Sequence, residues 1–339
     1  MKQRGFILVA TLWILAGITI AAAFFAQRIA SSIQLAKQYD AHIQSQVACS
    51  DSKAEIAYIL ATRPLSMYGI GDVAAHIKLD NQAYRMEGDC IARLQDTRGL
   101  YLINGANRDS LGILLNQKAV PESEHDKLYD TLMDYVDPNP NVHRLNGVAK
   151  SAYKEAGLPE PTGHPLITPD QLRQVYGWRD QKVLWQGDEP LTDWITTARA
   201  IALNPNTAPA PVLLTLPGVT PTVLPKLLQY RSIEPILNEV QLANLLGIDS
   251  QQLLLKVIAF PADTIRVSLG SGGQETSIRY NVALTPIAAD APWRIDYYYS
   301  VPQRITQKNN DAISSNPFDL KAAPPSAASN ISIFEAPPQ

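Results

Sequence analysis

The first sixty residues carry one continuous pattern that changes only in polarity. Residues 6–26 are uncharged and largely apolar, and residues 27–62 contain neither Gly nor Pro. In the second stretch, apolar residues recur three, four or seven positions apart among polar ones, at Ile29, Ile33, Ala36, Ile43 and Val47. This periodicity predicts one amphipathic helix that grows directly out of the apolar run. The helix should stop at Arg63, because Pro64 disfavours helical backbone in the residue before it.

The apolar run is long enough to cross a membrane. At 1.5 Å per residue, a helix of about 21 residues spans roughly 30 Å, the thickness of a hydrocarbon core. Lys2 and Arg4 precede the run, which predicts a cytoplasmic N-terminus and the bulk of the chain across the membrane. Two alternatives remain open. One is a secretory signal cleaved near residues 21–23, and the other is a plain signal anchor followed by a stalk.

Beyond residue 70 the pattern changes to short β-type segments. Alternation or β-branched and aromatic content predicts strands at residues 84–94, 99–104, 265–269, 277–284 and 294–301. We expect them to form one small antiparallel sheet, with a turn at residues 96–99 and a Gly-rich hairpin loop at residues 270–273. From residue 306 the chain is rich in Asn, Ser, Ala and Pro without periodicity, which predicts a flexible tail.

Residues 108–260 are helical in pattern and punctuated by Pro. One short motif recurs there, consisting of Leu, an apolar residue at +3, Gly at +5 and an apolar residue at +6. Its copies run over residues 172–178, 213–219 and 242–248. Each Gly supplies the left-handed conformation that ends a short helix. Three copies predict a helix-hairpin domain, of the type called SAM-like, inserted into the sheet.

Composition and charge exclude several functions. The net charge is −3, and the second repeat resembles a DNA-binding helix-hairpin-helix but has Thr220 in place of the second Gly. Only Lys226 and Arg231 are basic nearby, so we expect no nucleic-acid partner. The five His residues lack metal-ligand spacing, and neither a phosphate loop nor a nucleophile elbow occurs in the sequence. Nothing in the sequence indicates an enzyme.

The N-terminal residues resemble the class III signal of type IV pilins and type II pseudopilins. A short basic leader ends in Gly5, and Phe6 opens the apolar run and the uninterrupted helix. In that family a prepilin peptidase cuts after the glycine and methylates the new N-terminus. The resemblance therefore implies cleavage between Gly5 and Phe6 and N-methylation of Phe6. Most members carry Glu at the fifth mature position, where this chain has Ala10. The K-type minor pseudopilin, general secretion pathway protein K, also lacks that Glu, and the chain resembles it in this respect.

Two inner segments extend this resemblance, which covers most of residues 1–300. Residues 204–208 (Asn-Pro-Asn-Thr-Ala) resemble the K-type N-x-N-T-A signature, and residues 132–137 resemble its D-W-I-D region. The resemblance implies a tip subunit of the type II secretion pseudopilus that initiates assembly and limits its length for export of folded proteins. Implied partners are the other minor pseudopilins, the prepilin peptidase and inner-membrane lipid. The resemblance also implies a single pass through the inner membrane, with the bulk of the chain in the periplasm. The alternatives are a minor pilin of a type IV pilus or competence system and a signal-anchored periplasmic binding protein.

The expected fold is α+β, with a pilin-like long helix packed on a small antiparallel sheet and a large inserted helical domain. We predict a leader at residues 1–5, a transmembrane segment at 6–26 and a first pilin-like part at 27–107. The helical insertion follows at 108–260, the closing strands at 261–305 and a tail at 306–339.

Oxygen ligands gather after the middle of the chain, where the resemblance implies calcium. They are Asp130, Asp134, Asp137, Asn139 and Asn141, and the three Asp share a helix face. A calcium loop of the EF-hand type would have Gly and Glu where this chain has Val142 and Val148. The alternative interpretation is a solvated helix face with helix caps.

The two cysteines, Cys49 and Cys90, are predicted on the long helix and on a strand. The periplasm permits disulfides, and helix packs on sheet in this fold. A disulfide and two separately buried thiols both remain open at this point.

Overall fold

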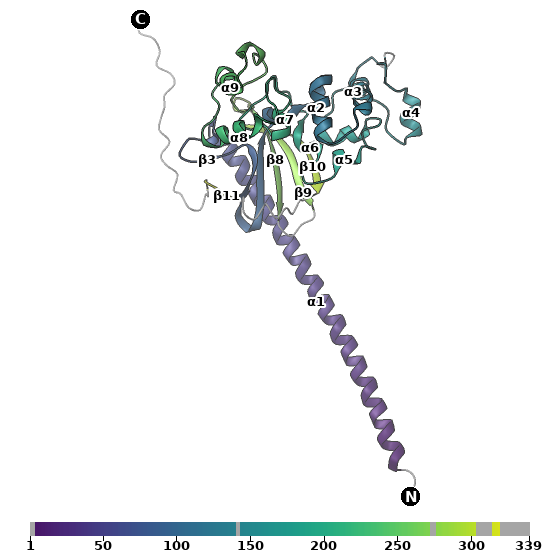
Figure 1. The fold of residues 1–339 in the computed structure, drawn as a ribbon. Coiled ribbons are helices and arrows are strands. Elements are labelled where there is room, and N and C mark those ends of the chain that lie inside the picture. The colour runs from purple at the N-terminus through teal and green to yellow at the C-terminus, as the bar shows by residue number, and fades with distance from the viewer. Residues whose placement is uncertain (1–3, 140–142, 272–275, 303–313, 319–339) are drawn as a thin grey trace.

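A computed structural model describes residues 4–139, 143–271, 276–302 and 314–318. Helix α1 (Arg4–Thr62) runs unbroken for 59 residues and projects far out of a rounded head, as Figure 1 shows. At 1.5 Å per residue its length is about 90 Å. The helix ends directly before Arg63, which confirms the predicted stop.

A six-stranded sheet forms the part of the head that packs on α1. Its order is β10-β9-β8-β5-β4-β11, and every neighbouring pair is antiparallel except β11 with β4. The strands are β4 (Asp80–Arg85), β5 (Cys90–Asp96), β8 (Thr264–Ser271), β9 (Thr276–Leu284), β10 (Trp293–Pro302) and β11 (Ser314–Ser315). A small separate sheet follows α1, made of β1 (Leu65–Ser66), β2 (Gly69–Gly71) and β3 (His76–Ile77). The predicted α+β architecture is confirmed.

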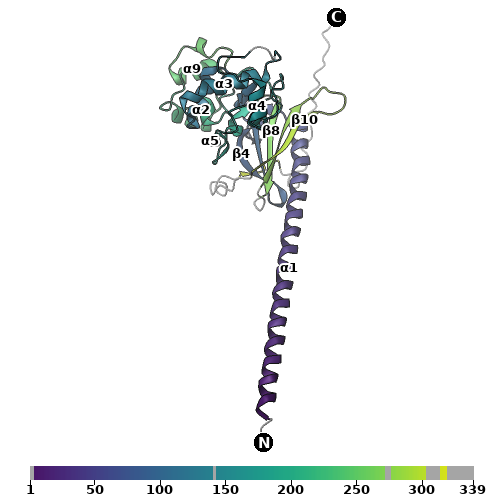
Figure 2. The same ribbon diagram turned by 90° about the vertical axis from the view of Figure 1, so that its right-hand side faces the viewer.

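The helical block connects β5 to β8, two adjacent strands of the sheet. Its α-helices are α2 (Arg108–Gln117), α3 (Glu122–Val136), α4 (Lys150–Glu155), α5 (Lys182–Trp185), α6 (Leu191–Trp194), α7 (Ala210–Leu213), α8 (Leu224–Ile233) and α9 (Glu239–Leu246). The 3-10 turns within it are η2 (Thr97–Gly99), η3 (Ile103–Gly105), η4 (Pro169–Gln174) and η5 (Ser250–Gln252). Figure 2 shows the block lying at the end of the sheet remote from the free end of α1.

The three repeat glycines have the left-handed backbone that the sequence predicts. Gly177, Gly218 and Gly247 have φ values of 81°, 77° and 71°, in the left-handed region. Gly218 also lies against Ile248 of the next copy, where a Cβ would come within 2.9 Å of the Ile248 side chain. The second and third copies therefore pack on each other. Only Gly247 directly ends a helix, since α7 ends at Leu213, before Gly218, and the first copy uses the 3-10 turn η4.

Two strand predictions were wrong. Residues 84–94 form not one strand but the end of β4, a turn (η1, Glu87–Asp89) and β5, because Gly88 takes a left-handed φ of 65°. Residues 99–104 contain β6 (Tyr101–Leu102), which pairs in parallel with β7 (Ile195–Thr196) and not with the main sheet. Turn η2 directs the chain out of the sheet before β6 begins.

Two loop predictions also needed correction. Gly270 and Ser271 belong to β8, and the rest of the predicted hairpin loop lies outside the described residues. Residues 314–318, predicted as tail, return to the sheet through β11. There Asn316 Nδ2 donates to Glu55 Oε1 of α1, and the Phe318 ring lies 4.9 Å from the Arg63 guanidinium.

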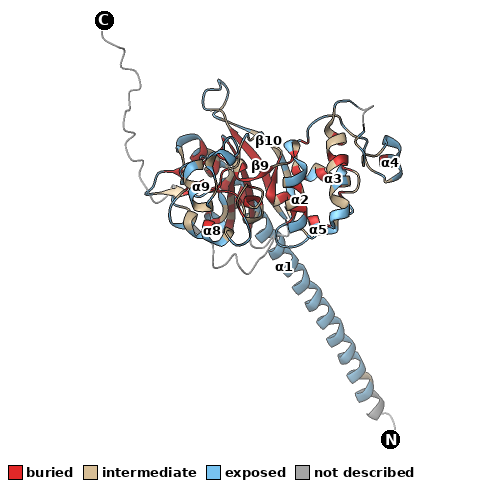
Figure 3. Ribbon diagram, turned by 45° about the horizontal axis from the view of Figure 1, so that its top comes forward, coloured by how far each residue is buried: buried red, intermediate tan, exposed pale blue. Residues whose placement is uncertain are grey.

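Only the end of α1 that lies within the head is covered by other elements. The buried face of the helix comprises Cys49, Ser52, Ile56, Ile59 and Leu60. Apolar side chains of β5, β8 and β9 pack against it and form one core, while the helical block has a separate core around Trp178. Figure 3 shows the contrast between the buried sheet and the exposed length of α1.

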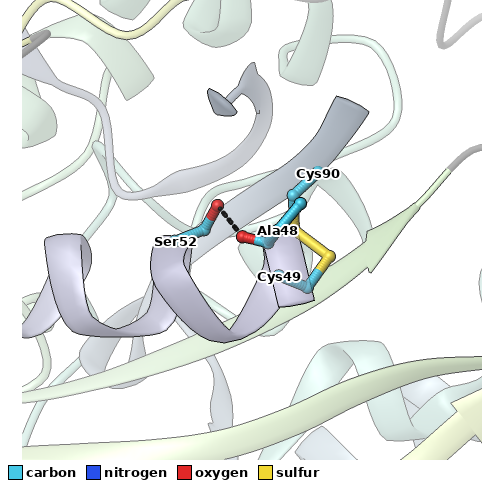
Figure 4. The surroundings of a disulfide bond; sticks show 4 residues. All are labelled: Ala48, Cys49, Ser52 and Cys90. Atoms are coloured by element: carbon cyan, nitrogen blue, oxygen red, sulfur yellow. Dashed lines mark hydrogen bonds between the residues drawn. A yellow bond between two sulfur atoms is a disulfide. The ribbon is translucent and has the colours of Figure 1, made fainter. Parts of the chain in front are cut away.

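A disulfide joins α1 to the sheet. Cys49 of α1 is bonded to Cys90, the first residue of β5, as Figure 4 shows. Of the two alternatives left open for these cysteines, the structure therefore contains the disulfide and not two separate thiols. The turn beside it fits closely on the helix, because a Cβ on Gly88 would lie 2.6 Å from the Ala48 Cβ.

We expect reduction of this bond to destabilise the head by about 4 kcal/mol, since it closes a loop with a sequence separation of 41 residues. The measurement is urea unfolding of the full chain in detergent, followed by tryptophan fluorescence, with and without dithiothreitol. The Cys49→Ala/Cys90→Ala double variant is the control. A dithiothreitol effect of equal size in that variant would show that the disulfide is not the cause.

Candidate functional site

The N-terminal half of α1 is the first candidate interaction surface. Between residues 8 and 25 every described side chain except Ala10 is largely exposed, and this stretch is apolar and long enough to cross a membrane. Gly5 and Phe6, the predicted processing residues, lie in the first turns of the helix, where side chains are not described. Ala10 lies one turn further along, in the same uncovered stretch.

The second candidate is the junction where the helical block meets the sheet. The Asp96 carboxylate, at the end of β5, is fully buried there. Its Oδ1 accepts hydrogen bonds from the amides of Arg98 and Ala262, each at 2.9 Å. Its Oδ2 accepts from Asn204 Nδ2 and Thr207 Oγ1, each at 2.8 Å. Burial raises the pKa of Asp96, and these four donors oppose the rise.

Four donated hydrogen bonds around one carboxyl group favour its ionised form, since three of the four donors are N–H groups that could not accept a proton from it. The donors come from segments far apart in the sequence, so the carboxylate ties the turn after β5, the loop at residues 204–207 and the entry to β8 together. Gly99 allows this approach, because a Cβ there would lie 2.7 Å from the Thr207 carbonyl carbon.

The residues of the N-x-N-T-A signature thus have structural partners. The Asn206 amide pairs with the backbone of Ile236, donating to its carbonyl at 2.9 Å and accepting from its N–H at 2.8 Å. Arg231 donates to the carbonyls of Pro205 and Ala208 at 2.9 and 2.6 Å. This guanidinium therefore points into the protein and holds the signature loop on α8.

A buried ionic cluster supports the same junction further along the sheet. Arg279 Nη1 of β9 lies 2.8 Å from Asp193 Oδ1 of α6, and both side chains are nearly buried. Arg266 of β8 donates to the carbonyls of Thr192 and Asp193 at 2.9 and 2.8 Å. Burial lowers the pKa of Arg266 to about 10. Burial also works against the charge of Arg279, but the neighbouring Asp193 and Tyr299 side chains together outweigh burial and raise the pKa.

The predicted calcium ligands are brought together only in part. On α3, Asp130 accepts from Asn146 Nδ2 at 2.8 Å and from Arg108 Nη2 at 2.7 Å. One turn later, Asp134 accepts from the N–H and from Nη1 of Arg144, the latter at 2.8 Å. Burial opposes ionisation of Asp130, but the bonds from Asn146 and Arg108 outweigh it and lower its pKa.

These carboxylates do not fit a calcium ion as they are arranged. Guanidinium and amide N–H groups already occupy the oxygens of Asp130 and Asp134, whereas calcium requires six to eight oxygens around one point. Gly147 packs directly against the Asp134 carboxylate, because a Cβ on residue 147 would overlap Asp134 Oδ2. Asp137 accepts from the Asn139 N–H, and Asn141 lies outside the described residues. No group of three or more acidic, His or Cys side chains suited to a metal occurs in the described part of the chain.

Comparison with known proteins adds one finding. No family model and no curated protein matches the sequence. Among solved structures, the chain matches one from "the GspK-GspI-GspJ complex from enterotoxigenic Escherichia coli Type 2 Secretion System", with a TM-score of 0.50 and 14% identity. The match covers 82% of this chain and 99% of the other. The two chains share a fold.

That likeness includes more than a helix and a small sheet. Because it extends over 82% of the chain, it must include much of the helical block as well as the pilin-like part. The junction residues Arg266, Arg279 and Asp193 had no signal in the sequence beyond charges placed within apolar segments. Asp96 stood out only as the first residue of a turn.

We expect Asp96→Asn to lower the free energy of unfolding by about 2–4 kcal/mol, because the amide NH2 would face donors and leave one unpaired. Urea unfolding of the full chain measures this loss. Asp263→Asn, an exposed change in the same region, is the control and should stay within about 0.5 kcal/mol of the parent. Equal effects of the two substitutions would contradict the role given to Asp96.

We expect chelation of divalent cations with EDTA to leave the melting temperature unchanged, and Arg144→Ala to lower stability by about 1–2 kcal/mol. The reason is that Arg144 balances Asp134, whose side chain is 6% exposed. Arg173→Ala, which removes an exposed pair with Asp170, is the matched control. A melting temperature that falls with EDTA and recovers with calcium would contradict this expectation.

Proposed function

We propose that the chain is a minor pseudopilin of a type II secretion system, located at the pseudopilus tip. The observation that carries this proposal is the fold shared with a chain of the GspK-GspI-GspJ complex, combined with an exposed apolar half of α1. The K-type resemblance of the sequence supports it independently, through Gly5, Phe6 and the N-x-N-T-A segment.

The tip position is supported by two features. Ala10 replaces the carboxylate that other subunits pair with the N-terminal amine of a neighbour, so this subunit has no buried charge that requires docking beneath another subunit. The helical block lies at the end of the head remote from the N-terminus of α1 (Figure 1). A subunit with that much bulk at the distal end would obstruct addition of another subunit above it and so limit length.

Assembly would begin in the inner membrane. A prepilin peptidase would cut after Gly5 and methylate Phe6, which removes the basic leader and leaves the apolar half of α1 in contact with lipid and neighbouring helices. Association would then occur side by side in the bilayer, with the folded head in the periplasm. The disulfide ties the sheet to α1, and the Arg279–Asp193 pair ties the helical block to the sheet, so the head stays attached as a single unit while the helix packs.

The test is co-expression of the full chain with a prepilin peptidase and the other minor pseudopilins of its own system. We expect a stable complex on gel filtration in detergent, and a mature chain that starts at methylated Phe6 by mass spectrometry. Gly5→Ala should abolish cleavage, because the peptidase recognises the residue before the cleaved bond.

Gly17→Ala, a glycine in the same apolar run, is the control and should be processed like the parent. An intact Met1 in the parent would support a plain signal anchor instead. Correct processing without any complex would support a pilin-type subunit and contradict the tip role.

A further inference from the structure

An apolar groove lies within the head, between α1 and the outer strands of the sheet. It encloses about 380 Å³ between α1 and the strands β9 and β10. Small side chains of α1 form one wall and large apolar side chains of the strands form the other, namely Ser50, Ala54 and Ala57 against Val282, Trp293 and Ile295. The volume falls in the range in which proteins enclose small ligands. An exposed apolar hollow of this kind indicates an interaction site.

One cation borders the groove. The Lys53 Nζ of α1 lies 5.4 Å from the centroid of the Tyr280 ring and 5.3 Å from that of the Tyr298 ring. Attraction to the two ring faces holds the ammonium group at the edge of the groove. No ion pair in the described part of the chain includes Lys53. An apolar occupant that also carries one carboxylate would therefore fit this groove better than a purely apolar one.

The chain itself carries a segment of that chemistry beyond the described residues. Residues 321–330 consist only of Lys, Ala, Pro, Ser and Asn, and Pro-Pro pairs stand at residues 324–325 and 337–338. Between the two pairs, the large apolar residues Ile331, Ile333 and Phe334 directly precede Glu335, the one acidic residue after Asp319. Residues 331–335, here called the tail segment, thus combine three large apolar side chains with one carboxylate.

The linker before the tail segment has the length that the groove requires. The ring of Phe318, the last described residue, lies 4.9 Å from the guanidinium of Arg63, directly after α1. Ala54, in the groove, precedes Arg63 by nine residues, about 14 Å along a helix. The 13 residue steps from Phe318 to Ile331 have a root-mean-square length of about 20 Å as a flexible chain. A linker that matches its span maximises the effective concentration of the attached segment, which favours the chain's own segment over that of a second copy.

We propose that the tail segment binds in this groove of its own chain, with Phe334 in the apolar hollow and Glu335 beside Lys53. The tail would then hold α1 from both sides of the sheet. Strand β11 already lies at the β4 edge, and the tail segment would cover the β10 edge. The contact lies within one chain and does not rest on the proposed function.

The experiment is photocross-linking of the full chain in lipid nanodiscs, which avoids detergent that could fill the groove. Benzoylphenylalanine replaces Phe334, or replaces Ser326 in the linker as a control. We expect cross-links within one chain from residue 334, and mass spectrometry should locate them in peptides that contain residues 50–58 or 280–295. The yield from residue 326 should be at least about tenfold lower.

Substitutions in the groove separate packing from charge. Ala54→Trp fills the hollow and should reduce the yield from residue 334 by about tenfold or more. Ala41→Trp, at an exposed alanine of α1 outside the groove, should leave the yield unchanged. Lys53→Glu should reduce the yield by about threefold, because it replaces an attraction by a repulsion. The double variant Lys53→Glu/Glu335→Lys should restore it, and a misfolded head could not produce that recovery.

Several outcomes would overturn the proposal. Cross-links that join two chains, seen as a dimer on a denaturing gel, would show that the groove binds a second copy. Cross-links outside the groove, equal yields from residues 334 and 326, or no recovery in the double variant would each contradict it as well.

Discussion

The buried Asp96 carboxylate is the interaction on which the two halves of the head depend. Removing an ion from water is costly, and here hydrogen-bond donors, not a cation, offset that cost. Those donors belong to the turn after β5, the signature loop and the approach to β8, so the charge is satisfied only when all three are in place. The helical block is therefore held in a defined position on the sheet even though each has its own core.

The parts that the sequence predicted well depend on local rules. The continuous helix, its end before Pro64 and the left-handed glycines at 177, 218 and 247 follow from periodicity and backbone preference within a few residues. The α+β class followed from the order of such segments. A local rule also produced an error, because alternation across residues 84–94 concealed the turn at Gly88.

What the sequence could not give depends on contacts between distant residues. Nothing near Asp96 in the sequence indicates Asn204, Thr207 or Ala262 as its partners. The acidic residues of α3 were interpreted as oxygen ligands because their spacing is visible, whereas Arg144 and Arg108 become their partners only after the chain folds back. A charge cluster in a sequence therefore does not reveal whether a metal or a guanidinium balances it.

The position of the insertion also orders the events of folding during synthesis. Strands β5 and β8 are hydrogen-bonded neighbours, yet the whole helical block separates them in the chain. During synthesis, β5 has no β8 to pair with until more than 160 residues have followed it. Its open edge would attract other strands in that interval. Early formation of the bond between Cys49 and Cys90 would fix β5 on α1 during that interval, and helical folding of the insertion would shorten the distance that β8 must cross.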